Sequence, residues 1–147
     1  MHPSICSAPC AAPATRAPEE TLRRFVAAFI NGGDEAVLAE LVDEDYVYRS
    51  PGEEARGHAG LAAMFRDLRA AFPDMALTIH DIIATADRTV LDFGLAGTHR
   101  GDFMGIPATG RPFDVRGVVI SRYRAGRIAE EWELLDTTTL LQQLGVA

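Results

Sequence analysis

The stretch FDVRGVVISRYRAGRIAEEWELL, residues 113–135, decides the fold. Residues 113–123 and 127–135 are rich in β-branched and aromatic side chains, and Arg124-Ala125-Gly126 between them is typical of a tight turn. Two more strands are expected at residues 77–84 and 89–99. These segments predict a meander of long antiparallel strands in the second half of the chain.

Helices are expected ahead of this meander. Apolar residues recur at helical spacing from residue 22 to residue 30, after Pro18-Glu19-Glu20. Asp34 can cap a second helix, and a third ends at Pro73. A run of helices followed by a run of strands predicts an α+β fold, with a curved sheet on three N-terminal helices and a cavity at its wide end. The smaller expected elements are a short strand at 46–48 and a closing helix at 137–144.

Composition narrows the classes of function. The 147 residues fit a flexible N-terminal tail, 1–18, and one domain, 19–147. The net charge of −7 and the absence of a basic run argue against a nucleic-acid partner. No apolar stretch approaches the roughly 18 residues that span a bilayer, and the tail is a poor secretory signal, so a cytoplasmic protein is expected. Cys6 and Cys10 are interpreted as free thiols, with a disulfide between chains as the alternative.

Three motifs resemble one known family. GTHRGDFMGIPATGR, residues 97–111, resembles the GTHxGxFxGIPPTGR signature of SnoaL-like polyketide cyclases, with Ala108 in place of a Pro. GRIAEEWELLD, residues 126–136, resembles the GKIxExWDxxD ending of the family, and Gln142-Gln143-Leu144-Gly145 resembles its QLG close. The resemblance implies a cone-shaped fold of the nuclear transport factor 2-like kind around an apolar pocket. Relatives on that fold include ketosteroid isomerase, scytalone dehydratase, epoxide hydrolases and proteins that only bind.

The resemblance implies a catalytic carboxylate at Glu133. Cyclases of the family use an acid/base carboxylate on the last long strand, where this chain has Glu instead of the usual Asp. Apolar walls raise the pKa of such a group towards neutrality, which suits proton transfer. Glu131 shares a strand face with Glu133, and Glu130 takes the other face. Some cyclases carry a His at the position of Val119, so the proton-transfer partner in this chain comes from elsewhere or the reaction differs.

Three residues are candidate partners of Glu133, each with a plainer alternative. His99 can relay protons or bond the backbone of its Gly-rich loop. Asp92 interrupts an apolar strand, so it either faces the pocket or pairs with Arg116. Tyr48 stands where relatives often have His, and its phenol can bond a substrate oxygen. The predicted substrate-binding residues, each of which could also be ordinary core, are Phe29, Tyr46, Met64 and Met104.

The sequence therefore predicts a cofactor-independent cyclase of the isomerase or lyase type in natural-product biosynthesis. Its substrate would be an apolar, oxygenated small molecule that closes a ring by an aldol step or by epoxide opening. The alternatives are an epoxide hydrolase, a binding protein without catalysis, and an interaction module. No metal-binding motif or nucleotide loop is present in the sequence. Val118 and Ile120, on the second face of their strand, predict a homodimer through the sheet face, with exposed aliphatic residues on a monomer as the alternative.

Overall fold

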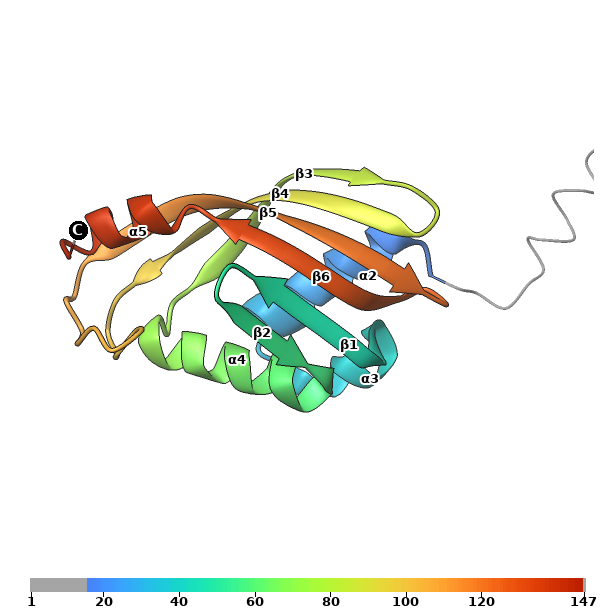
Figure 1. Ribbon diagram of the computed structural model, residues 1–147, viewed down its shortest axis with the longest axis horizontal. Helices are drawn as coiled ribbons and strands as arrows, with labels where there is room; N and C mark the ends of the chain where they lie inside the picture. The colour runs from blue at the N-terminus through green and yellow to red at the C-terminus, as the bar shows by residue number, and fades with distance from the viewer. Residues whose placement is uncertain (1–15, 147) are drawn as a thin grey trace, which may run out of the picture.

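The computed structural model describes residues 16–146, and it combines short helices with one six-stranded sheet (Figure 1). The predicted tail lies mostly, and Cys6 and Cys10 lie entirely, outside the described residues. The helical elements are α2 (Pro18–Arg24), the π-helical η1 (Phe25–Asn31), the 3₁₀-helical η2 (Glu35–Val37), α3 (Leu38–Leu41), α4 (Gly57–Ala71) and α5 (Thr137–Gln143). The strands are β1 (Val42–Ser50), β2 (Glu53–Arg56), β3 (Ala76–Ala84), β4 (Arg88–Thr98), β5 (Pro112–Arg124) and β6 (Arg127–Leu135).

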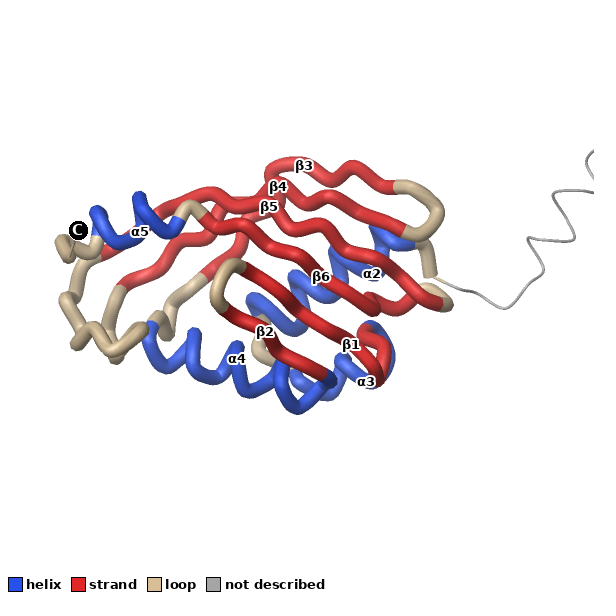
Figure 2. Tube along the Cα trace, viewed as in Figure 1, coloured by secondary structure: helices blue, strands red, loops and turns tan. Residues whose placement is uncertain are grey.

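The sheet has the strand order β2-β1-β6-β5-β4-β3. Strands β1 and β6 pair in parallel, while each other neighbouring pair is antiparallel. The sheet curves without closing, and α2 passes behind it in the view of Figures 1 and 2. The predicted α+β architecture is confirmed. Two details differ. Residues 53–56 form a short edge strand that was not expected, and the strand expected at 46–48 is longer, since β1 begins at Val42.

Strand β5 shows which face of the sheet is buried. Its residues alternate strictly between buried and exposed, with Val115, Val119 and Tyr123 buried and Val118 and Ile120 exposed. This period of two is the one that a strand with one covered face requires. The buried face is called the inner face below, and the opposite face the outer face.

A one-residue bulge sets which side chains of β6 reach the inner face. The hairpin turn has positive φ at both Ala125 (51°) and Gly126 (78°), as a type I′ turn requires. Tyr123 then pairs with Ile128 but Arg122 pairs with Glu130, so Ala129 has no partner opposite. Because the bulge resets the alternation, the odd-numbered residues from 131 onward face inwards.

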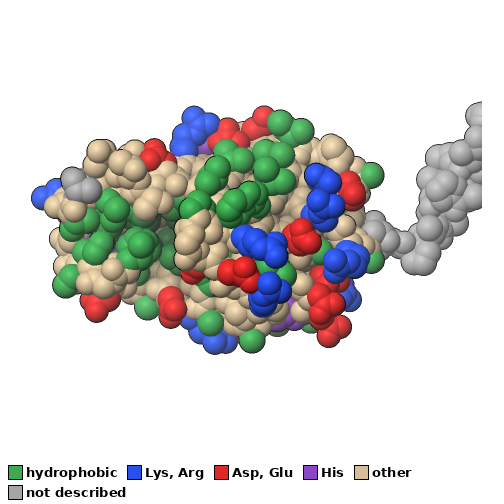
Figure 3. Space-filling view, viewed as in Figure 1, with side chains coloured by type: hydrophobic (Ala, Val, Ile, Leu, Met, Phe, Trp, Pro, Cys, Tyr) green, Lys and Arg blue, Asp and Glu red, His purple; other side chains and the backbone are tan. Residues whose placement is uncertain are grey.

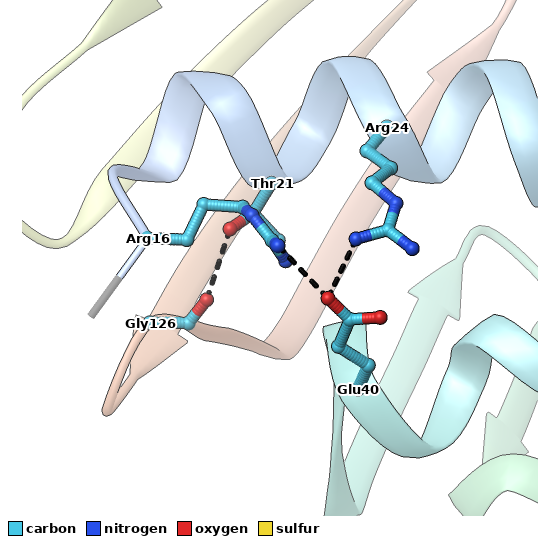
Figure 4. Close-up of polar contacts among 5 residues, drawn as sticks. All are labelled: Arg16, Thr21, Arg24, Glu40 and Gly126. Atoms are coloured by element: carbon cyan, nitrogen blue, oxygen red, sulfur yellow. Dashed lines mark hydrogen bonds and ion pairs between the residues drawn. The ribbon is translucent and has the colours of Figure 1, made fainter. Parts of the chain in front are cut away.

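Helix α2 is fixed to the sheet and to α3 by polar contacts at its surface (Figure 4). The buried Thr21 hydroxyl donates to the carbonyl of Gly126 at 3.1 Å, which joins the helix to the β5–β6 turn. Glu40 of α3 accepts from both Arg16 (2.8 Å) and Arg24 (2.6 Å). These ion pairs are exposed to water and contribute little, so the apolar face of the helix supplies most of the packing energy.

The core consists of two hydrophobic clusters. The larger lies under α2, η1 and α3 and includes Phe29 and Tyr46, both fully buried. The smaller is built around Phe72 and Phe113, near α5. The partly exposed side chains that pack against both clusters are Phe65, Leu95 and Leu135. In the described part of the chain, no helix is long and apolar enough to cross a membrane.

Candidate active site

Glu133 lies on the inner face of β6, where water still reaches it. It pairs across the strands with Val119 of β5, and its side chain is only partly buried. Tyr48 of the parallel neighbour β1 donates its hydroxyl to Glu133 Oε1 at 2.8 Å. The structure therefore brings two of the predicted catalytic residues, Glu133 and Tyr48, into direct contact.

The surroundings place the protonation of Glu133 near neutrality. Burial raises the pKa of Glu133 to about 7, although the hydrogen bond from Tyr48 acts in the opposite direction. The negative charges of Glu131 and Glu53 also contribute to this raised pKa. Burial and the charge of Glu133 raise the pKa of Tyr48 far above its ordinary value, so Tyr48 stays protonated and acts as a donor only. Glu133 can thus take up and release a proton at neutral pH.

A second carboxyl lies deeper on the same face. Glu131 is 7% exposed, and each of its oxygens accepts one hydroxyl hydrogen bond. Tyr46 donates to Oε1 at 2.6 Å, and Ser121 of β5 donates to Oε2 at 2.9 Å. Burial raises the pKa of Glu131, while the two hydrogen bonds lower it. The predicted substrate-binding residue Tyr46 is therefore a core residue whose hydroxyl holds this carboxyl.

Partly exposed apolar side chains pack against the same core cluster as Tyr48 and Val119, the two residues that flank Glu133. We call this set the inner apolar surface, and it consists of Met64, Phe65, Leu77, Leu95 and Leu135. Leu135 follows Glu133 on the same face of β6, and Leu77 pairs with Leu95 across β3 and β4. Helix α4 supplies the other two side chains, Met64 and Phe65, and substrate binding by Met64 stays a prediction. Phe29, another predicted substrate-binding residue, is fully buried in the larger cluster and packs edge-on against Phe65.

Asp92 lies on the other side of the sheet from Glu133. It is flanked in β4 by the inward-facing Leu91 and Phe93, so the alternation turns it outwards. Both of its carboxylate oxygens accept from Arg116, at 2.9 and 2.7 Å. The structure therefore supports the ion-pair alternative for Asp92 and not the pocket role.

A surface groove of about 320 Å³ lies elsewhere, between the short helices η2 and α3 and helix α4. It contains an exposed ion pair between Arg66 and Glu35. His58 also lines it, and Nε2 of His58 contacts the Val42 carbonyl at 2.7 Å. The groove shares no residue with the Glu133–Tyr48 contact, so we assign the chemistry to the inner face. Among residues 16–146, no group of three or more His, Cys, Asp or Glu could hold a metal ion.

The model of the SnoaL-like polyketide cyclases matches residues 20–144. The chain belongs to this family. No curated protein matches the chain.

Solved structures agree with the assignment to the SnoaL-like family. IdmH from Streptomyces antibioticus, described as a candidate polyketide cyclase, is 38% identical over 89% of this chain and 100% of its own, with a TM-score of 0.79. TsrD from Streptomyces laurentii is 30% identical over 88% of this chain and 95% of its own, with a TM-score of 0.79. AclR from Streptomyces galilaeus, described as a candidate hydroxylase, is 28% identical over 88% and 96%, with a TM-score of 0.76.

His99, in the SnoaL-like signature loop, does not lie near Glu133. His99 lies eight residues beyond Leu91, the β4 neighbour of Val119, which is about 26 Å along an extended chain. It is fully buried, and its Nδ1 accepts from the backbone N–H of Thr109 at 3.2 Å. Because that donor cannot accept, the ring proton is on Nε2, which has no partner among the described residues. His99 therefore holds the two ends of the loop together.

Met104 is not among the residues of the inner apolar surface of this SnoaL-like chain. Its side chain is 74% exposed in the signature loop, where its φ is 50°. A substrate contact of Met104 therefore stays a prediction. Sequence reasoning missed Ser121 altogether, because only the β5–β6 register places it opposite Glu131.

Proposed function

We propose that this protein is a cofactor-independent cyclase in which Glu133 transfers protons to and from an apolar, oxygenated substrate. The observation that carries the proposal is a partly exposed carboxyl with a pKa of about 7, held by Tyr48 beside the inner apolar surface. A carboxyl with this pKa is present in both protonation states at neutral pH, as an acid/base catalyst needs. Membership of the polyketide cyclase family supports the same reaction class.

The geometry favours an aldol closure carried out by one carboxyl. The Glu133 carboxylate removes a proton from a carbon between two carbonyls of the substrate. The resulting enolate carbon attacks a further carbonyl carbon of the same molecule, which forms the ring bond and an alkoxide. Glu133, now protonated, returns its proton to that alkoxide, so the atoms of substrate and product balance. Tyr48 remains protonated and fixes the orientation of the carboxyl.

Epoxide opening has less support from the site. It requires an acid on the epoxide oxygen and a base on the nucleophile at the same time. Asp92, the second carboxylate of that hypothesis, faces outwards, and Glu131 is buried beneath Tyr46 and Ser121. The same argument applies to an epoxide hydrolase.

Proton abstraction can be tested without the natural substrate. We would incubate the protein in D₂O with an aryl 1,3-diketone and follow exchange of the α-proton by NMR. We expect Glu133→Gln to lower the protein-catalysed exchange rate by about 100-fold or more. The matched control is Glu130→Gln, on the same strand but on the outer face, which should keep the wild-type rate.

Each outcome of that experiment decides between enzyme and binder. If Glu133→Gln exchanges as fast as the wild type, the catalytic assignment of Glu133 is wrong. If neither protein accelerates exchange although the diketone binds both, a binding function replaces the cyclase. Ring closure of linear polyketone mimics, followed by mass spectrometry and NMR, then tests the cyclisation itself.

We also propose that the protein forms a homodimer through the outer face of the sheet. An apolar patch there consists of Ile83, Val90, Val118, Ile120, Trp132 and Leu134, and Figure 3 shows hydrophobic side chains gathered over β5 and β6. Trp132 is 49% exposed and Leu134 60% exposed. Two ion pairs also lie on this face, Arg116–Asp92 and Arg122–Glu130. Because the face carries both positive and negative charges, two copies related by a two-fold axis can match opposite charges.

Sedimentation of the purified protein tests the dimer. Ile120→Glu puts a charge at the centre of the patch and should convert the dimer to a monomer. Met104→Glu is the control, because Met104 is also an exposed apolar residue but does not belong to the patch. A wild-type protein that is already monomeric at micromolar concentration contradicts this proposal and leaves the cyclase proposal intact.

A further inference from the structure

Glu131 is a buried carboxyl to which the cyclase reaction gives no role. It is on the inner face of β6, two residues before Glu133. Both of its hydrogen-bond partners, Tyr46 and Ser121, are neutral hydroxyl groups, so no cation offsets its charge at these contacts. Burying a carboxylate in this way is costly, and an uncharged Gln could accept and donate hydrogen bonds at the same two hydroxyls.

Every element packed around Glu131 presents neutral or acidic groups to it. Strand β1 supplies the hydroxyls of Tyr46 and Tyr48, and β5 supplies Ser121 and Tyr123, whose hydroxyl is in turn bonded to Thr89 of β4 at 2.9 Å. Helices α2 and α3, which contact β6, contribute the buried side chains Thr21, Leu22, Leu38 and Leu41. The nearby acidic group is Glu133, on which the negative charge of Glu53 of β2 also acts.

We propose that Glu131 is a positioning residue that acts through Glu133: held by Tyr46 and Ser121, its carboxylate sets the pH range in which Glu133 exchanges protons. Two residues on one strand face are about 7 Å apart, close enough for one negative charge to oppose another across the poorly solvated core. Glu133 therefore keeps its proton to a higher pH than burial alone would give. The inference extends the proposed function, since it assigns Glu133 the proton transfer.

The test follows the titration of Glu133 itself, without any substrate. The full chain is labelled with ¹³C at the glutamate side-chain carboxyl, and the Glu133 signal is assigned by its loss in Glu133→Gln. In Glu131→Gln we expect the midpoint of the Glu133 titration to fall by about one pH unit. Glu131→Asp keeps the charge and should leave the midpoint near the wild-type value.

Two comparisons guard the interpretation. Glu130→Gln removes a carboxylate from the same strand on the outer face, and it should leave the Glu133 midpoint unchanged. If circular dichroism shows that Glu131→Gln does not fold, Ser121→Ala takes its place. It removes one donor that favours ionised Glu131, so the Glu133 midpoint should fall by a smaller amount.

An unchanged or raised Glu133 midpoint in a folded Glu131→Gln or Ser121→Ala protein overturns the proposal and leaves Glu131 as a structural hydrogen-bond acceptor. This result is separate from the fate of the cyclase. The titration reports on Glu133 in the free protein, whereas the exchange assay with Glu133→Gln reports on catalysis.

Discussion

Strands β1 and β6 form the same contact twice, once in the core and once at its edge. Tyr46 donates to Glu131 at 2.6 Å, and two residues further on each strand Tyr48 donates to Glu133 at 2.8 Å. The Tyr46–Glu131 pair is closed off from water and has Ser121 as a second donor. The Tyr48–Glu133 pair has one donor and a carboxyl that water reaches. The same two residue types thus form a buried pair and a pair that water reaches, and we propose proton transfer only for the second.

The largest expected difference between the pairs is in stability. Tyr46→Phe leaves a buried carboxyl with one donor fewer, which should lower the free energy of unfolding by about 2–3 kcal/mol. Tyr48→Phe should cost under about 1 kcal/mol, because water can replace its hydroxyl at Glu133. Urea unfolding at pH 7 measures both variants. Equal losses would mean that burial does not separate the pairs.

The next effect is on the pH dependence of stability. Glu133 titrates near pH 7 in the folded chain but near 4.3 when unfolded, so the folded state binds the extra proton between these values. The contribution of Glu133 is therefore present below about pH 4 and is lost as the pH rises through 7. Glu133→Gln should remove this loss and make the protein more stable at pH 8 by about 2 kcal/mol, after allowance for the water that reaches the carboxyl.

Chemical denaturation from pH 5.5 to pH 8 measures that slope. Glu130→Gln serves again as the control and should keep the wild-type slope. A Glu133→Gln protein with an unaltered slope would show that Glu133 is ionised throughout this range.

A smaller effect concerns the hydrogen bond from Tyr48 to Glu133. Tyr48 favours the charged form of Glu133, so Tyr48→Phe should raise the pKa of Glu133 above about 7, by roughly half a unit to one unit. The ¹³C titration described above measures the change. A lowered midpoint would mean that Tyr48 affects Glu133 mainly by excluding water.

The smallest effect is expected outside the two pairs, at Asp92. Asp92→Asn breaks an ion pair with an exposed Arg116 and should change the free energy of unfolding by under about 1 kcal/mol. Exchange of the diketone proton should stay at the wild-type rate. A loss comparable to that of Glu133→Gln would place Asp92 in the reaction after all.

Local sequence patterns were sufficient for the four long strands β3 to β6 and for the shared face of Glu131 and Glu133. Strict alternation along β5 and a turn at Ala125-Gly126 depend only on neighbouring residues. The same alternation could have excluded Asp92 from the pocket, since Leu91 and Phe93 on either side of it are core residues. Asp92 was nevertheless a pocket candidate, because a charged residue in an apolar strand is unusual.

The partners of the carboxyls depend on register, which a single sequence does not contain. Ser121 meets Glu131, and Tyr48 meets Glu133, only because β5 and β1 flank β6 at particular offsets. His99 was assigned by its chemistry, but its place beyond the end of β4 separates it from Glu133 by the length of the strand. The edge strand β2 was missed because its four residues, Glu53–Arg56, are charged and short.

The unpaired Ala129 lets the β5–β6 hairpin change its length without moving Glu133. Deleting this residue would leave Tyr123 opposite Ile128 and Arg122 opposite Glu130, so every later pair, including Val119 with Glu133, would keep its register. A deletion further along β6 has the opposite effect, because a slip of one residue turns every following side chain to the other face. Relatives could therefore lose the residue at position 129 with both faces of the sheet unchanged, whereas the same loss beyond it would exchange the two faces.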